Sequence, residues 1–400
     1  MRVPSRFLVA GAALAAFFFI GGCASTDTGT QQKLPPPENL AITCVPFGEV
    51  GVVDAALNCT ATKNGAAYTD VTYALANVNG AEASISSTGI ITPGSSTGNA
   101  TVTVTDSATG TTATATLPIV NWIVYNQAID GVANTLVANA DGSGTPVQLI
   151  ANGCYNPQWL HSHLGFVCTS NVPKVSVLQE FMTDGTATGT KLTATLTFTA
   201  SAIWADLASP SPDGKTVIFR GLTQPGGTTN QYGVFQATLV DGTTTATALE
   251  EDEPCGSITC YTMGQPYYNN IGTQVLYGHV VGSESSLNTS LNTMNPDGTG
   301  QAEVVNLSPI MVGFGIYSAD SSEVFFSEAT ETTEFGTYVV PSTGGAPSST
   351  PVIAGVFGVV AAPDKNHLAY PAGNGLVVTD INGGHAKTVV TGAGINHPSW

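Results

Sequence analysis

The sequence predicts an all-β protein in which a small first domain precedes a larger one built from repeats. Gly, Thr, Ser, Ala and Val dominate the 400 residues, and charged residues make up only 10% of them. This composition favours many short strands joined by tight turns over helices. Two patterns carry the prediction further. Short apolar alternations broken by Gly, Pro and Asn fill the first part, and a strand-and-turn unit recurs through the second.

The first 22 residues have the pattern of an export signal. Two arginines within the first six residues precede an uncharged apolar run, residues 7–20, which is shorter than a comfortable membrane span. The run ends in Ile20-Gly21-Gly22-Cys23, which resembles the lipobox at which a bacterial signal peptidase cuts before a lipidated cysteine. The alternative is an ordinary signal peptide with an incidental cysteine. The resemblance implies lipidation of Cys23, and the Ala that follows implies sorting to the outer membrane.

The charge of the chain limits the classes of partner that it can bind. Without the signal segment, eight basic residues stand against 28 acidic ones, a net charge of −20. A surface this acidic repels nucleic acid and acidic polysaccharide, so we expect neither as a partner. The rest of the chain contains no second apolar stretch of membrane-spanning length. We therefore expect the membrane to be a partner only through acyl chains on Cys23.

The cysteines agree with export. Setting Cys23 aside leaves six, an even number that suggests pairing in an oxidising compartment. Fifteen pairings are formally possible, but pairing of neighbours closes three short loops and respects the repeat boundaries described below. A metal site would need thiolates at CxxC-like spacing, which the sequence lacks. We predict the disulfides Cys44–Cys59, Cys154–Cys168 and Cys255–Cys260.

Residues 23–38 form the predicted lipidated tether, because they are polar, contain three consecutive prolines and have no apolar period. Residues 39–120 alternate like short strands. Within them, residues 83–104 place Gly89 and Gly94 where turns need glycine, and Val102 and Val104 on one face of a strand. This stretch resembles the last three strands of bacterial group 2 Ig-like domains. The resemblance implies a small Ig-like sandwich over residues 39–120.

Residues 121–400 contain a repeat. A short apolar strand with an aromatic residue recurs at intervals of 43 to 58 residues. Several copies follow a turn such as Ser211-Pro212-Asp213-Gly214, and several precede an Asp-Gly or Asn-Gly hairpin signal. The six strands end at Tyr125, Cys168, Phe219, Tyr277, Phe326 and Tyr370.

The repeats resemble those of the TolB family of propellers. The residues that carry the resemblance are the turns above and the segments Asn156-Pro157-Gln158-Trp159, Gln265-Pro266-Tyr267-Tyr268 and His397-Pro398-Ser399-Trp400. The resemblance implies a six-bladed TolB-like β-propeller over residues 121–400. The chain stops where an inner strand should be followed by the rest of its blade, and the strand at 122–125 supplies a partner. We expect the two ends to pair and to close the ring, which removes a raw sheet edge.

Catalytic signals are weak. The sequence has no GxSxG motif, and no Ser or Cys lies in an activating context. His161 and His163 have the alternate spacing of strand-borne metal ligands but fall in an expected loop, so we predict neither a metal nor any other cofactor. The remaining histidines could meet only through the fold. Four aromatic residues at corresponding inner-strand positions are expected to pack between blades, or to face the channel and grip a sugar or peptide: Trp159, Tyr268, Tyr317 and Trp400.

These observations favour a non-enzymatic cell-envelope lipoprotein whose propeller presents a protein- or peptide-binding face on an Ig-like spacer. The first alternative is a channel-centred polysaccharide-cleaving enzyme, with or without a metal, since some TolB-like propellers place histidines and a metal at the channel. The second is a purely structural or adhesive surface protein. An enzyme should bring histidines and carboxylates together at one mouth of the channel. A binding protein should present aromatic and polar loops there without a titratable cluster.

Overall fold

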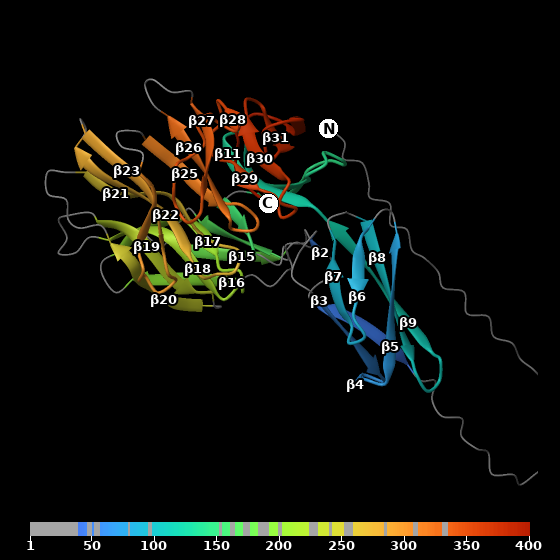
Figure 1. Cartoon of the computed structure of the whole chain (residues 1–400). Helices are drawn as coiled ribbons and strands as arrows, with labels where there is room; N and C mark the ends of the chain where they lie inside the picture. Colours follow the sequence, from blue (N-terminus) through green and yellow to red (C-terminus); the bar gives the residue numbers. More distant parts are fainter. Residues whose placement is uncertain are drawn as a thin grey trace, which may run out of the picture. The chain divides into compact units, whose positions relative to one another are not determined.

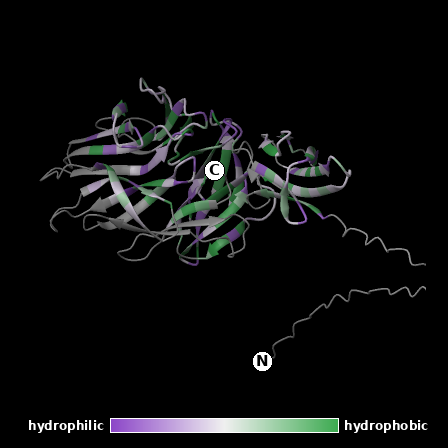
Figure 2. Cartoon of the chain, turned by 90° about the horizontal axis from the view of Figure 1, so that it is seen from below, coloured by the Kyte–Doolittle hydropathy of each residue, from purple (hydrophilic) through white to green (hydrophobic). Residues whose placement is uncertain are grey.

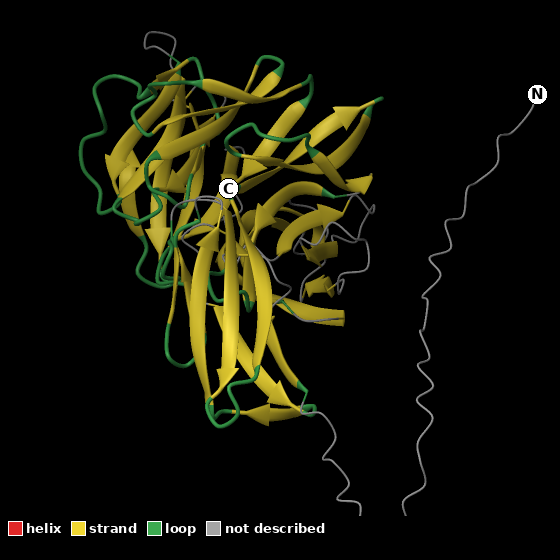
Figure 3. Cartoon of the chain, turned by 90° about the vertical axis from the view of Figure 1, so that its right-hand side faces the viewer, coloured by secondary structure: helices red, strands yellow, loops and turns green. Residues whose placement is uncertain are grey.

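The strands predicted from the composition are present throughout the structure, a computed structural model. It describes residues 39–45, 50–51, 57–78, 81–94, 98–151, 154–160, 165–170, 177–182, 192–198, 202–223, 231–239, 242–251, 259–283, 286–306, 311–329 and 335–400. Within these ranges every regular element is a β-strand, as Figure 3 shows. Accordingly, no helix in the described part of the chain is long and apolar enough to cross a membrane.

The first nine strands form a sandwich of two sheets. One sheet has the order β1-β3-β7-β6, with β4 beside β3, and the other has the order β2-β9-β8-β5. Their bounds are β1 Leu40–Val45, β2 Val50–Gly51, β3 Leu57–Lys63, β4 Ala66–Tyr68, β5 Val71–Val78, β6 Ala83–Ile85, β7 Ile90–Pro93, β8 Gly98–Asp106 and β9 Thr112–Val120. Relationship to the Ig-like family remains a prediction from the sequence.

Buried and exposed side chains alternate along the strands, and the buried ones form the core of the sandwich. Val102 and Val104 of β8 are fully buried, as their spacing predicts, while the threonines that alternate with them face the other side. Val102 packs in one cluster with Ile91 of the opposite sheet. The predicted disulfide Cys44–Cys59 joins directly opposed residues of β1 and β3. The sandwich is therefore stabilised both by apolar burial and by a crosslink between neighbouring strands.

A buried carboxylate fixes the β8–β9 hairpin. Asp106 is 1% exposed and accepts hydrogen bonds from Lys63 Nζ at 2.8 Å, Tyr68 Oη at 3.2 Å and the amide of Ala108 at 2.8 Å. The bond from Lys63 is the main reason that the pKa of Asp106 lies well below its usual range. The carboxylate thus stays ionised and ties two strands of one sheet to the hairpin of the other.

The remaining 24 strands form six four-stranded blades, which agrees with the predicted six-bladed propeller (Figure 1). Blade 1 combines β33 Ile395–Ser399 with β10 Trp122–Ile129, β11 Val132–Asn139 and β12 Val147–Ala151. Blade 2 holds β13 Tyr155–Trp159, β14 Gly165–Ser170, β15 Val177–Met182 and β16 Leu192–Phe198, and blade 3 holds β17 Ala202–Pro210, β18 Thr216–Thr223, β19 Gln231–Thr238 and β20 Gly242–Glu251.

The other three blades are continuous in the sequence. Blade 4 comprises β21 Thr259–Tyr268, β22 Val275–Ser283, β23 Ser286–Met294 and β24 Ala302–Asn306. Blade 5 comprises β25 Met311–Tyr317, β26 Glu323–Ala329, β27 Gly336–Pro341 and β28 Ile353–Ala354. Blade 6 comprises β29 Val360–Ala361, β30 His367–Ala372, β31 Gly375–Asp380 and β32 Lys387–Thr391.

The two ends of the repeat region close the ring, as the sequence predicts. The last strand, β33, pairs antiparallel with β10, with Ser399 opposite Val124 and Ile395 opposite Gln127. Outside the strand pairing, Trp400 Nε1 donates a hydrogen bond to Asn121 Oδ1. Residues almost 280 positions apart therefore share one blade, and blade 1 is complete only when both ends are in place.

One feature differs from a set of six separate blades. Strand β16 pairs in parallel with β20, with Thr195 opposite Thr243, so blades 2 and 3 form one eight-stranded sheet. A free outer strand exposes a row of unpaired backbone groups, and this pairing satisfies such groups on both blades at once.

Apolar residues lie between neighbouring blades. The second strand of each blade carries the predicted apolar triplet, and Figure 2 shows hydrophobic segments running along the strands of the propeller. Phe219, Phe325 and Ile123 are at most 1% exposed. Each cluster joins residues of adjacent blades, such as Ile218 of β18 with Tyr268 and Tyr277 of blade 4. Burial of these faces is the main stabilising contribution to the ring.

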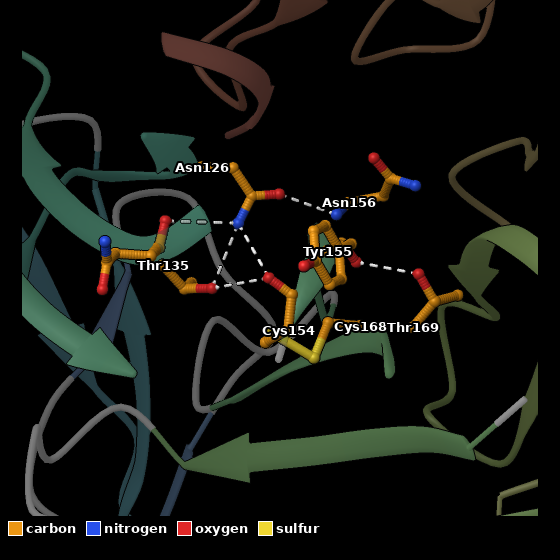
Figure 4. The surroundings of a disulfide bond; sticks show 8 residues. Asn126, Thr135, Cys154, Tyr155, Asn156, Cys168 and Thr169 are labelled. Atoms are coloured by element: carbon orange, nitrogen blue, oxygen red, sulfur yellow. Dashed lines mark hydrogen bonds between the residues drawn. A yellow bond between two sulfur atoms is a disulfide. The ribbon is translucent and has the colours of Figure 1, made fainter. Parts of the chain in front are cut away.

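A buried polar network joins blade 1 to blade 2 beside the second predicted disulfide, Cys154–Cys168 (Figure 4). Asn126 Nδ2 donates to the carbonyl of Cys154 at 2.9 Å and to Thr135 Oγ1 at 3.2 Å, and Asn126 Oδ1 accepts the amide of Asn156 at 2.8 Å. Thr135 Oγ1 also donates to the same Cys154 carbonyl. Asn126 is 2% exposed, so water cannot replace these bonds.

We predict that Asn126→Ala lowers the free energy of unfolding by about 2–3 kcal/mol, because it leaves buried partners in both blades unsatisfied. The control is Gln127→Ala on the same strand, whose side chain makes one 3.4 Å bond in an exposed position. That variant should change stability by less than about 0.5 kcal/mol. Chemical denaturation of both variants under oxidising conditions measures the difference, and equal losses would contradict the role assigned to Asn126.

Candidate functional site: the central channel

The six first strands of the blades surround a central channel. Strands β33, β13, β17, β21, β25 and β29 follow one another around the axis. Near their carboxyl ends the channel widens into a cavity of about 550 Å³, which we call the mouth. Every one of the six strands, or the turn that follows it, contributes to its wall. The mouth is therefore a product of the whole ring.

One ring of positions on the wall of the mouth is polar on one side and largely apolar on the other. Two consecutive residues near the end of each inner strand line the mouth, and at the first of these two positions three consecutive blades supply Ser399, Gln158 and Ser209. The next three blades supply Tyr267, Ile316 and Val360 at the corresponding positions. The only charged residues among the described lining residues are Asp364 and Lys365. The mouth thus suits a ligand with distinct polar and apolar sides.

A second cavity of about 170 Å³ lies deeper in the channel, and we call it the inner cavity. Gln158, Tyr267, Ile316 and Val360 line both cavities, so the two adjoin. His397 also lines the inner cavity. Its side chain is exposed there, yet the surrounding protein lowers the pKa of its imidazole. Burial raises the pKa of the Tyr267 hydroxyl, so both groups are neutral near pH 7.

Local backbone strain accompanies these side chains. The inner strands of blades 1, 2 and 3 each contain a bulge, and the residue within it has a positive φ: His397 at 47°, Asn156 at 52° and Leu207 at 50°. A non-glycine residue in this region costs about 1 kcal/mol or more. A bulge shifts the alternation of side chains along the strand. Here it contributes to the placing of His397 on the wall of the inner cavity.

The four aromatic residues expected at the inner strands lie between the blades and also reach the mouth. Trp159, Tyr268 and Tyr317 are each less than 10% exposed and pack in apolar clusters, and Trp400 packs against another cluster. All four line the mouth. Packing between blades, the first alternative, is therefore confirmed, whereas a role of these rings in gripping a sugar or peptide stays a prediction.

The turns after the inner strands frame the mouth. In blade 3, Asp213 Oδ1 accepts hydrogen bonds from Ser211 Oγ and the amide of Lys215, which lowers the pKa of this carboxyl. In blade 4 the corresponding position is Ile271, and Asn269 Oδ1 accepts the turn amides instead. The Ile271 side chain therefore takes no part in the hydrogen bonds of the turn, and it is 75% exposed next to Asn269 and Asn270, which line the mouth. We call the turns around the mouth the rim.

The described histidines do not gather at one place. Among them, only His397 lines a channel cavity. His367 and His385 lie on blade 6, where His367 Nδ1 contacts Asp364 at 2.6 Å and His385 Nδ1 contacts Asp380 at 2.5 Å. No group of three or more His, Cys, Asp or Glu side chains in the described ranges is placed to hold a metal ion.

Several predicted residues lie outside what the structure describes: Cys23, Cys255, His161, His163 and the side chain of Cys260. The residues that the sequence reasoning missed are Gln158 and Tyr267, each of which precedes an aromatic residue that was singled out. Strand alternation could have found them, because the neighbour of a residue packed between blades points the other way.

Two equivalent tyrosines allow a matched test of the packing between blades. Tyr268 Oη accepts a hydrogen bond from Gln236 Nε2 at 2.7 Å and lies 3.2 Å from Thr216 Oγ1, whereas the buried Tyr317 hydroxyl has no partner among the residues that the structure describes. Tyr268→Phe should lower the free energy of unfolding by about 1 kcal/mol. Tyr317→Phe should leave it unchanged or raise it slightly. Urea denaturation of the two variants decides, and a larger loss for Tyr317→Phe would contradict the assignment.

Comparisons with known proteins agree with this architecture and go no further than the fold. No protein-family model matches the chain, and no curated protein sequence does. TolB from Acinetobacter baumannii is similar in structure, with a TM-score of 0.53, 12% sequence identity and coverage of 82% of each chain. An oligogalacturonate lyase in complex with manganese has a TM-score of 0.48 at 12% identity, covering 68% of this chain and 74% of its own. A putative TolB from Agrobacterium tumefaciens has a TM-score of 0.46 at 12% identity, covering 68% and 91%. The chain shares its propeller architecture with TolB.

Proposed function

We propose that the protein is a non-enzymatic lipoprotein of the cell envelope whose propeller binds a protein or peptide partner at the mouth of the channel. Its disulfides are typical of a protein that folds outside the cytoplasm. In this proposal Cys23 carries the lipid, residues 24–38 form a tether, and the sandwich, as an Ig-like spacer, carries the propeller. The outer membrane is the proposed site of attachment.

The observation that supports binding over catalysis is the chemistry of the mouth. Its described wall consists of aromatic, amide, hydroxyl and aliphatic groups, with one carboxylate and one ammonium group. A general acid and base, or a metal with its ligands, would require several titratable groups around one point. Rigid aromatic rings beside adaptable polar groups are instead typical of surfaces that bind proteins and peptides.

The rim adds an apolar anchor to this surface. Ile271 is 75% exposed, and its neighbours Asn269 and Asn270 line the mouth. Pro212 and Pro363 occupy the turns of other blades at the same rim. A partner that covers the rim would bury Ile271, and burial of a large aliphatic side chain favours binding by about 1.5–3 kcal/mol.

Site-specific photo-crosslinking in the producing bacterium tests the proposal. With Ile271→p-benzoylphenylalanine, illumination should join the protein to a discrete partner, because this side chain lies on the binding rim. The matched control is Val147→p-benzoylphenylalanine, since Val147 is 52% exposed on the outer strand β12 of blade 1. An adduct specific to Ile271 supports the proposal. Equal labelling from both positions, or none from Ile271, would refute a binding face at the rim.

Elemental analysis of the purified full-length protein separates this function from the metal-dependent enzyme. We expect no stoichiometric transition metal after dialysis against a weak chelator, because the described channel wall supplies a single histidine. The control is His161→Ala/His163→Ala, which removes the other candidate ligands. A metal present in the parent protein and lost in this variant would overturn the non-enzymatic function and lead to assays of polysaccharide cleavage.

A further inference from the structure

The inner cavity contains polar groups that the fold leaves without partners. Gln158 is only 6% exposed and lines both cavities, and its side-chain amide makes no hydrogen bond to another described residue. Tyr267 and His397 line the same inner cavity, and in the described part of the chain neither the Tyr267 hydroxyl nor the His397 ring has a hydrogen-bond partner. An amide that lines a cavity and meets no protein partner has its donors and acceptor available to a ligand. Such a group at the wall of a cavity indicates a ligand that would satisfy it.

Neighbouring polar groups of the channel, in contrast, have hydrogen-bond partners within the protein. Gln265, 5% exposed on β21, donates through Nε2 to Ser209 Oγ and to the carbonyl of Ala208, both at 2.9 Å. Ser399 Oγ accepts the amide of Trp159 at 3.0 Å. Hydroxyls that accept in this way still have their own hydrogen to donate. The polar half of the channel therefore offers donors and acceptors beyond those of Gln158.

The charges of the site exclude an ionic ligand. Gln158 has no charge, the lowered pKa of His397 keeps its imidazole neutral near pH 7, and the raised pKa of Tyr267 keeps its hydroxyl protonated. No carboxylate, ammonium or guanidinium group lies among the described residues of the inner cavity. A charged ligand would lose its hydration there and find no counter-charge.

The opposite wall excludes a ligand that is polar all round. Ile316, Val359 and Val360 line it together with the ring of Phe357, which is 38% exposed. Aliphatic and aromatic groups of this kind pack against the C–H face of a ring. A hydrocarbon would leave Gln158 unsatisfied, and a chain terminus would bring a charge. The cavity volume of about 170 Å³ has room for one six-membered ring with its substituents.

We propose that the inner cavity binds a neutral monosaccharide unit, with Gln158, Tyr267 and His397 holding its hydroxyl groups and the Ile316–Val360 side of the channel covering its apolar face. The ligand enters through the mouth, because the two cavities share four lining residues. The inner cavity adjoins the mouth but does not include Ile271, and sugar binding there does not require the protein partner proposed above.

The test uses the full-length protein in a detergent that contains no sugar. Saturation-transfer difference NMR and titration of tryptophan fluorescence report binding, since Trp159 and Trp400 line the adjoining mouth. The probes are methyl glycosides of glucose, galactose and N-acetylglucosamine, with glucuronate and glucosamine as charged counterparts. We expect saturable binding of at least one neutral glycoside and no binding of the charged sugars.

Two variants locate the binding. Gln158→Leu should weaken it about tenfold or more, because the amide bonds to the sugar are lost. Tyr267→Phe removes a single oxygen atom and should weaken binding without disturbing the fold. The control is Gln148→Leu on β12, where the side chain is exposed on the outside of blade 1.

Each other outcome would overturn the proposal: no saturable binding of any neutral glycoside, stronger binding of glucuronate, or unchanged affinity in both channel variants. Photo-crosslinking from Ile271 is independent of these results. If no partner is crosslinked but sugar binding is intact, the sugar site in the inner cavity is supported without the protein-binding rim. If a partner is crosslinked but no sugar binds, only the protein-binding rim is supported.

Discussion

The pairing of β33 with β10 is the contact on which the rest of the propeller depends. Strands β10–β12 alone would leave blade 1 without its inner strand, and the channel would lack one wall. With β33 in place, Ser399 and His397 reach the channel, and Ser399 Oγ accepts the amide of Trp159 in blade 2. One strand pair thus closes the ring and completes both cavities. The loop that it closes spans most of the chain, so its entropy cost must be offset by the packing of all six blades.

Closure of the ring also determines which residues adopt a strained backbone conformation. Asn156 and His397 have positive φ on neighbouring inner strands. The amide of Asn156 is held by Asn126, whose other bonds reach Cys154, the partner of Cys168 in a disulfide. A network that joins two blades can impose a conformation that an isolated strand would avoid. The polar side of the channel is therefore built where blades 1 and 2 meet, at the point of closure.

The elements that repeat in every blade could be predicted from the sequence, but the features in which the blades differ could not. The apolar triplets, the Ser-Pro-Asp-Gly-like turns and the closure follow from local patterns, because each blade needs the same buried strand and the same turn. The parallel pairing of β16 with β20 has no local signal, since it depends on where two outer strands happen to approach. The exposure of Ile271 was equally hidden, because Asn269 takes over the hydrogen bonds that Asp213 makes in blade 3.

The division of the channel into polar and apolar halves could not be predicted for a different reason. It is a property of the order around the ring: Ser399, Gln158 and Ser209 become neighbours only when β33 lies beside β13. The chain as a whole has a net charge of −18, yet the described wall of the inner cavity has no charged side chain. Charges on the surface keep such a protein soluble, whereas an uncharged interior can present hydrogen-bonding groups without attracting counter-ions. The acidic exterior repels anions as they approach the channel, and the uncharged wall of the inner cavity disfavours any ion inside it. Neutral, partly apolar ligands meet neither barrier.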